Sequence, residues 1–159
     1  HLFDREKLIF DVPRDGFTSF TAGTRAGMMI CFDWVFPEVC RALALAGVRL
    51  VLHPSNLVLP YCQQAMTTRC IENRVFAITC NRVGRETHGG RSLRFTGRSQ
   101  VVGPRGEVLC RASATREELQ LVRFDPAAAA DKHMTSHNDL FADRRPELYR
   151  ALVARRRPH

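Results

Sequence analysis

Cys31 is the residue of this sequence whose position points most directly to chemistry. It ends the apolar run GMMI and precedes Phe-Asp-Trp, which places a thiol at the end of a predicted buried strand and at the start of a turn. A thiol there can face a cleft, and the backbone N–H groups that follow it can point into the same space, as a nucleophile requires for the oxyanion of its tetrahedral intermediate. The alternative is that Cys31 is a small apolar filler.

Two polar residues elsewhere in the chain are candidates for activating this thiol, whose ordinary pKa of ~8.5 leaves it mostly protonated at neutral pH. His53 ends another predicted strand, where it either forms a Cys–His pair or hydrogen-bonds to backbone, and we favour the second interpretation. Glu6 stands between basic residues in DREK, where it is either a base or a simple surface charge. Asp33 is interpreted as a structural residue that orients the turn after Cys31.

Strands and helices alternate along the part of the chain that must position these residues. Hydrophobic patterning and turn signals predict strands over 27–31, 48–54 and 75–84, with helices over 36–46 and 63–73. Beyond them we predict a loop over 88–97, a hairpin over 99–112, a strand over 119–125, an alanine-rich helix opening at Pro126 and a polar tail from 135. This order is typical of an α/β protein.

Several polar side chains and thiols fall at the ends of these strands. In open α/β sheets, sites gather at the carboxyl ends of the strands. We therefore expect Cys31, His53–Asn56 and Cys80–Asn81 to share one site.

Length and composition fit one ordinary globular domain, with 159 residues, 45% hydrophobic and 25% charged. No apolar run approaches the roughly 20 residues that span a bilayer, so no membrane partner is expected. Six cysteines form no C-x-x-C pair and no zinc-type cluster with histidine. They favour a reducing, cytoplasmic compartment, and no metal or organic cofactor is implied.

The net charge of +8 comes from an arginine excess that is concentrated towards the C-terminus. Such clusters are found in nucleic-acid contacts and equally in solvated tails. Here the arginines are not interleaved with aromatic residues, as a base-stacking surface would require. We therefore favour the tail, and a nucleic-acid binder is the last of our hypotheses.

Five stretches, in order and together covering nearly the whole chain, carry a family resemblance: HLFDREKLIF, GMMICFDWVFPEVCRALALAGVRLVLHPSNLVLPY, AMTTRCIENRVFAITCNRVGRE, FTGRSQVVGPRGEVL and NDLFADRRPELY. They resemble the C-terminal part of a nitrilase-superfamily carbon–nitrogen hydrolase, and the Cys31 stretch is the most specific. The resemblance implies one domain over 1–159 that is incomplete at its N-terminus. It also implies the C-terminal part of a four-layer α-β-β-α sandwich.

The chemistry implied by the resemblance uses a glutamate base, a lysine, a cysteine nucleophile and a second glutamate. The cysteine attacks an amide or nitrile carbon, ammonia or an amine leaves, and water activated by the glutamate hydrolyses the thioester. By position, Cys31 corresponds to the nucleophile and the backbone N–H of Phe32 to an oxyanion donor. Glu6 corresponds to the second, supporting glutamate.

The chain departs from the family pattern near its start. The family's lysine lies two positions before HLF and its base glutamate lies further upstream, so neither is present in a sequence that begins at His1. We therefore expect these residues to be inactive until an upstream part is restored. The family's Pro-Gly-Asp turn is also altered, because residues 12–15 read Val-Pro-Arg-Asp.

The residues after Cys31 bear on the substrate. Nitrilases proper tend to show Cys-Trp-Glu, and family members that hydrolyse N-carbamoyl amino acids place arginines just after the cysteine. Neither pattern is present, so we expect an apolar pocket wall and a small amide substrate, with Trp34 and Asn56 lining the pocket.

The alternative to a hydrolase is a non-catalytic remnant or assembly subunit that binds a partner. In either case an incomplete sandwich exposes apolar sheet surface, which predicts a homo-oligomer or a complementing N-terminal segment.

Overall fold

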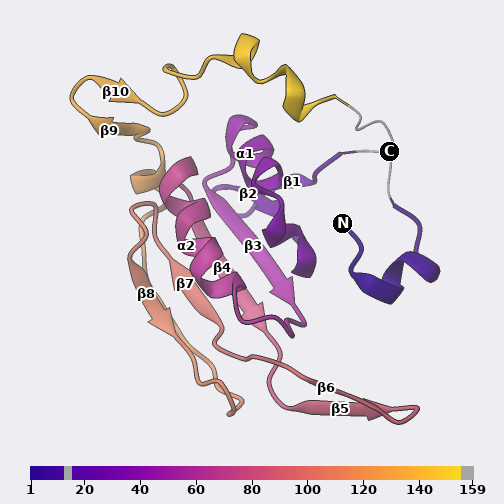
Figure 1. Ribbon diagram of the computed structural model, residues 1–159. Coiled ribbons are helices and arrows are strands. Elements are labelled where there is room, and N and C mark those ends of the chain that lie inside the picture. Colours follow the sequence, from indigo (N-terminus) through magenta and orange to yellow (C-terminus); the bar gives the residue numbers. More distant parts are fainter. Residues whose placement is uncertain (13–15, 155–159) are drawn as a thin grey trace.

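A mixed six-stranded sheet forms the centre of the computed structural model, which describes residues 1–12 and 16–154 (Figure 1). Across the sheet the strands are β1 (Ser19–Thr21), β2 (Arg25–Met28), β3 (Leu50–Ser55), β4 (Phe76–Asn81), β7 (Gln100–Val102) and β8 (Val108–Arg111). The α/β class predicted from the sequence is confirmed. The altered turn at 13–15 and the arginines at 155–157 lie outside the described residues.

The neighbouring strands β2, β3 and β4 run parallel, so their carboxyl ends point to the same edge of the sheet. Ala26 of β2 lies opposite Leu50 of β3, which lies opposite Phe76 of β4. The strands β1, β7 and β8 pair antiparallel with their neighbours. Pro54, predicted to stop its strand, lies inside β3. It is tolerated because β2 pairs with β3 only as far as Leu52, which leaves an unpaired edge beside the proline.

Two helices, α1 (Pro37–Leu45) and α2 (Cys62–Asn73), cover one face of this sheet (Figure 1). Both were predicted, and α1 starts with its proline at the first position, where no backbone N–H is needed. The main core lies beneath them and includes three fully buried cysteines: Cys40, Cys62 and Cys70. Burial raises the pKa of Cys40 and of Cys62 to about 12, so these thiols act as small hydrophobes.

The opposite face of the sheet is covered more sparsely. Phe124 stacks on Phe76 with ring centroids 4.4 Å apart, beside a small buried cluster. The strand predicted over 119–125 is wrong, because this segment pairs with no strand of the described sheet. Its alternating pattern leaves Leu119 and Leu121 exposed at 84% and 88%. An alternating sequence becomes a strand only where a neighbouring edge supplies hydrogen bonds.

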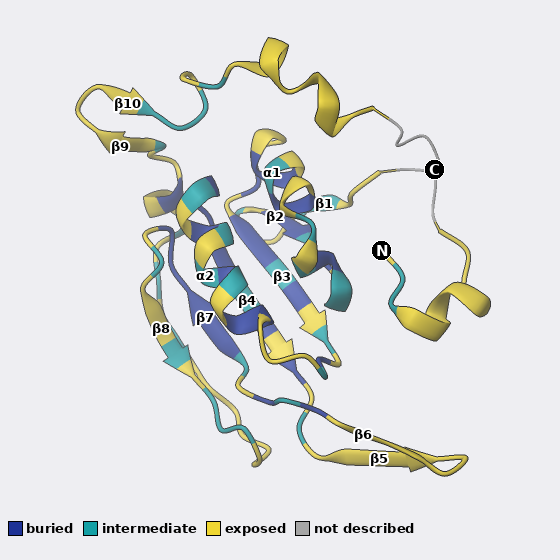
Figure 2. Ribbon diagram, in the orientation of Figure 1, coloured by how far each residue is buried: buried dark blue, intermediate teal, exposed yellow. Residues whose placement is uncertain are grey.

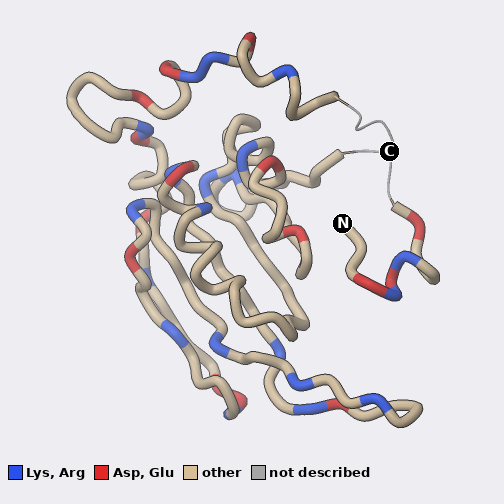
Figure 3. The backbone as a smooth tube through the Cα atoms, in the orientation of Figure 1, with Lys and Arg blue, Asp and Glu red and all other residues tan. Residues whose placement is uncertain are grey.

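A projecting hairpin, β5 (Arg85–His88) and β6 (Arg91–Arg94), replaces most of the loop predicted over 88–97 (Figures 1 and 2). Gly89 and Gly90 form its tip with φ of +55° and +75°, the left-handed values that favour glycine in a two-residue hairpin turn. Figure 2 shows both strands exposed along their whole length, and Figure 3 shows the basic residues spaced along them. Because neither strand has a buried face, the hairpin has no alternating apolar pattern from which it could have been predicted.

The C-terminal part is anchored to the far end of α2. Only a short 3-10 helix, η3 (Pro126–Ala129), forms where an alanine-rich helix was predicted. Lys132 then donates through Nζ to the carbonyls of Asn73, Arg74 and Ala129 at 3.1, 2.8 and 2.8 Å. A cation there satisfies the carbonyl groups at the helix end.

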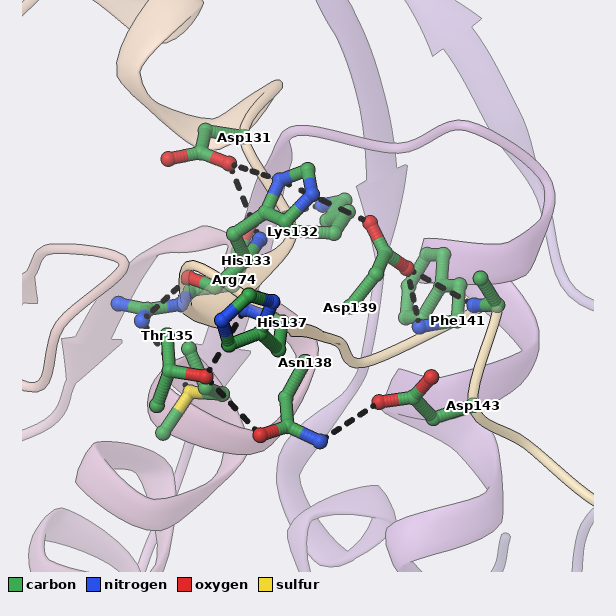
Figure 4. Close-up of polar contacts among 12 residues, drawn as sticks. Arg74, Asp131, Lys132, His133, Thr135, His137, Asn138, Asp139, Phe141 and Asp143 are labelled. Carbon is green, nitrogen blue, oxygen red and sulfur yellow. Dashed lines mark hydrogen bonds and ion pairs between the residues drawn. The ribbon is translucent and has the colours of Figure 1, made fainter.

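Beyond this anchor, the predicted polar tail contains some regular structure. A hairpin, β9 (His133–Thr135) and β10 (Asn138–Asp139), is held by the polar contacts drawn in Figure 4. An arm with two short turns, η4 (Pro146–Leu148) and η5 (Arg150–Leu152), follows it. None of the described helices is both long and apolar enough to span a membrane.

Candidate active site

Cys31 begins the short 3-10 turn η2 (Cys31–Val35), which follows β2 at the carboxyl edge of the parallel strands. Its φ is +44°, in the left-handed region that is costly for a residue with a Cβ. The buried carboxylate of Asp33 supports the turn by accepting the backbone N–H of Ile30 at 2.8 Å. It also lies 2.8 Å from Nδ1 of His1. Asp33 is thus the structural residue that the sequence predicted.

His53 lies next to the backbone of Cys31. Its Nε2 is 2.9 Å from the carbonyl oxygen of Cys31, and its Nδ1 is 3.2 Å from Oγ1 of Thr79. The interpretation of His53 as a backbone-bonded residue is confirmed. Burial lowers its pKa, with the bond to Cys31 opposing that change, so the imidazole is neutral at pH 7.

The surroundings of Cys31 act on the pKa of its thiol in opposite directions. Burial is the largest and raises the pKa of the thiol. Backbone hydrogen bonds from Asn56 and Phe32 lower the pKa, and the nearby carboxylates of Glu6 and Asp33 raise it. The backbone N–H groups of Asn56 and Phe32 therefore favour the thiolate and oppose the effect of burial.

A cleft of about 930 Å³ opens beside this sulfur at the strand ends. Its border includes Cys31, Pro54 and Ser55 at the end of β3, Asn56 just after it, and Cys80 and Asn81 at the end of β4. Of the residues expected to share one site, these six border the cleft, whereas His53 is buried and does not border it. Glu6 also borders the cleft, from the short helix η1 (Asp4–Leu8), with its carboxylate accepting the backbone N–H of Phe3 at 2.7 Å.

A second, much smaller cavity of about 20 Å³ adjoins Cys31 and is almost wholly apolar. We call it the apolar slot. Trp34 and Asn56, predicted to line a substrate pocket, both border it, together with residues that the sequence analysis did not single out: Phe3, Leu57, Val58 and Leu59. Those residues carry no polar or reactive group, so only their tertiary placement marks them.

The lining of the cleft also includes residues in and around the β5–β6 hairpin, which the sequence analysis did not single out. Arg82 pairs with Glu86 at 2.6 Å and its guanidinium lies 4.4 Å from the ring centroid of Phe95. The three residues border the cleft together with Leu93. The charge of Arg82 is thus already partly compensated by Glu86.

The described residues contain no group of three or more His, Cys, Asp or Glu side chains placed to hold a metal ion. The groups that border the cleft include the Cys31 thiol and the Glu6 carboxylate, and backbone N–H groups of Phe32 and Asn56 lie beside that thiol. Such a set is suited to acyl transfer through a covalent thioester.

The sequence matches the carbon-nitrogen hydrolase family over residues 1–133, and the chain belongs to this family. The resemblance to the nitrilase superfamily is thereby confirmed. Among relatives, a nitrilase of Pyrococcus abyssi is 45% identical over 150 residues, a match that covers 94% of this chain and 56% of that protein. An N-carbamoylputrescine amidase of Arabidopsis thaliana is 30% identical over 164 residues, covering 94% and 54%.

Solved structures of the same kind share the fold. A carbon-nitrogen hydrolase from Helicobacter pylori G27 has a TM-score of 0.86 and 28% identity, covering 94% of this chain and 56% of its own. A variant of the amidase from Nesterenkonia sp. AN1, with the acetamide moiety of fluoroacetamide added covalently at its active site cysteine, has a TM-score of 0.78 and 29% identity over 96% and 53%. The chain spans about half the length of the proteins it matches.

Proposed function

We propose that these residues form the nucleophile-bearing part of a cysteine-dependent carbon–nitrogen hydrolase that acts on small amides. The observation that carries the proposal is the position of Cys31. It occupies a left-handed turn at the carboxyl edge of the sheet, with backbone donors from Asn56 and Phe32 at its sulfur and a cleft beside it.

In the proposed mechanism the Cys31 thiolate attacks the amide carbon, and a C–S bond forms while the carbonyl oxygen becomes negatively charged. The N–H groups of Phe32 and Asn56 stabilise that oxyanion, and one such donor contributes roughly 3–4 kcal/mol. The C–N bond then breaks, and the leaving amine takes up the proton that the base removed from the Cys31 thiol. Water hydrolyses the thioester, which releases the acid and restores the thiol. Glu6, which borders the cleft, is proposed to be the second, supporting glutamate that the family resemblance implies.

Turnover also needs a base and a cation, because burial raises the pKa of the Cys31 thiol. The family resemblance assigns these roles to a glutamate and a lysine upstream of the position that matches His1. We propose that the 159 residues alone are inactive and that an upstream segment restores the activity. The exposed Leu119 and Leu121 support association of this face with another polypeptide, either that segment or a second copy of the chain.

The apolar slot supports a small, uncharged acyl group on the substrate. Its walls include Trp34, Leu57 and Leu59, and none of the arginines that the structure describes borders it. Two relatives are named as a nitrilase and as an N-carbamoylputrescine amidase. A variant of the Nesterenkonia amidase has been solved in complex with butyramide. An apolar wall beside the thiol favours the simple amide among these substrate classes.

The test measures ammonia release from acetamide and butyramide by the 159-residue chain and by a version extended upstream through the family's lysine and glutamate. We expect turnover only in the extended protein. Cys31→Ala should abolish it, whereas Cys110→Ala, on β8 away from the cleft, should not. Unchanged turnover in Cys31→Ala would overturn the proposal. An extended protein without turnover would favour the non-catalytic alternative.

A further inference from the structure

We propose that His53 is a positioning residue that holds the backbone of Cys31 in the conformation that presents its sulfur to the cleft. The inference rests on the proposed function, since it assigns to His53 a role in the same nucleophilic site. His53 acts through the Cys31 peptide group and exchanges no proton with the substrate.

The backbone of Cys31 needs such support. Its φ of +44° is a left-handed value that a residue with a side chain adopts only when its surroundings hold it there. On the side before Cys31, the Asp33 carboxylate holds the N–H of Ile30 at 2.8 Å. On the side after it, Nε2 of His53 holds the Cys31 carbonyl at 2.9 Å. Two side chains thus bracket one strained residue.

The protonation state of His53 follows from its partners. A carbonyl oxygen can only accept, so the ring proton is on Nε2, where it is donated to Cys31. Nδ1 then carries a lone pair, which accepts from the Thr79 hydroxyl at 3.2 Å. Ser55 Oγ lies 3.1 Å from Nε2 and shares the same proton. The ring is 1% exposed, so bulk water does not compete for these bonds.

A loss of this bond should change the chemistry of the thiol. If Cys31 relaxed towards an ordinary φ, its sulfur would move away from the backbone donors of Asn56 and Phe32, which stabilise the thiolate. The thiolate would then form only at higher pH. A residue that merely stabilised the fold would change the melting temperature and leave that titration unaltered.

The first experiment measures the rate of Cys31 alkylation by iodoacetamide across pH, resolved by site with mass spectrometry, with Cys110 as the internal reference. His53→Leu keeps the bulk of the side chain and removes the donor. His53→Gln retains an N–H donor near the position of Nε2. We expect a higher titration midpoint in His53→Leu and alkylation about tenfold slower at neutral pH, as one unit of pKa implies. His53→Gln should recover most of the wild-type profile.

Thr79→Val provides a second route to the same result, because it removes the hydroxyl that holds the ring tautomer. It should shift the Cys31 midpoint in the same direction by less, and it carries the test if His53→Leu fails to fold by circular dichroism. Equal midpoints in the wild-type chain and in every folded variant would overturn the inference.

The second experiment measures amide turnover in the upstream-extended protein. His53→Leu should lower kcat about tenfold with little change in KM, because the defect lies in the nucleophile and not in substrate binding. An unchanged kcat would overturn the inference. If the wild-type extended protein released no ammonia, the proposed function would fail, and the alkylation profiles would still decide the role of His53.

Discussion

The side-chain oxygen Oδ1 of Asn81 accepts the backbone N–H of Leu57 at 2.8 Å. Through Nδ2 the same buried side chain donates to Oγ1 of Thr96 at 2.9 Å and to the carbonyl of Gly97 at 2.7 Å. One amide at the end of β4 therefore joins the loop after β3 to the segment that precedes β7. That loop carries Asn56, a backbone donor to the Cys31 sulfur.

Asn81→Ala should destabilise the chain by about 1–3 kcal/mol, because the buried N–H of Leu57 loses its partner. The carbonyl of Gly97 keeps one donor, Nε2 of Gln63 at 3.0 Å. Urea unfolding measures the free energy. The matched control is Asn138→Ala, which removes an exposed amide with two hydrogen bonds and should change stability by no more than about 0.5 kcal/mol. Equal losses in the two variants would contradict the anchoring role of Asn81.

Gly27→Ala should cost about 1–3 kcal/mol through overpacking beneath α1. A Cβ at Gly27 would lie 2.8 Å from Cδ2 of Leu43 and 3.0 Å from Cγ2 of Val48, both of which are buried in the core. The check is a double-mutant cycle by urea unfolding. Val48→Ala should cost less in the Gly27→Ala background than in the wild-type chain, since it makes room for the new methyl group. If the losses of unfolding free energy in the two single variants simply added up in the double variant, the clash with Val48 would not be the cause of the destabilisation.

Stability should fall in mild acid because of His53. Burial places its folded-state pKa below the ordinary 6.5, although the bond to Cys31 and the charge of Asp33 act the other way. The unfolded chain therefore binds the proton first as the pH falls. The contribution of His53 is fully present above about pH 6.5 and is lost below it, by at most about 1.4 kcal/mol per pH unit, down to the folded pKa.

The measurement is the free energy of unfolding of the wild-type chain and of His53→Gln, each at about pH 7.5 and about pH 5.5. The two proteins differ only at residue 53, so a difference in their pH dependence comes from that residue. The wild-type chain should lose more stability than His53→Gln between these conditions. An identical loss would mean that another group causes the acid sensitivity.

Leu59→Ala should widen the apolar slot and change the preference among substrates in the upstream-extended protein. We expect the ratio of kcat/KM for hexanamide to that for acetamide to rise about tenfold, the size of effect that one or two methylene groups produce in an apolar pocket. Leu109→Ala is the matched control, because the two leucines are exposed to nearly the same extent, 37% and 39%, and Leu109 lies on β8 away from the slot. A rise in both variants, or in neither, would contradict the assignment of the slot to the acyl group.

Local patterning by itself determined most of the framework around the site. The apolar spacing that includes Val39 and Leu43 predicted α1, and the apolar runs predicted β3 and β4 nearly in place. The strand predicted over 27–31 overlaps β2 only at Gly27 and Met28. These signals are local, since the period of burial along one element shows in its own residues. Because parallel strands end at a common edge, the sequence also indicated that Cys31, Asn56 and Asn81 would meet there.

Only the tertiary structure decided which partner each of these groups has. Nothing near His53 in the chain shows that its ring bonds to the carbonyl of Cys31, because that contact depends on β2 and β3 lying side by side in one register. The same reason explains the errors at β5–β6 and at 119–125, where the presence or absence of a neighbouring strand decided the conformation. Hydrogen-bond partners distant in the chain are set by packing, and local sequence does not record them.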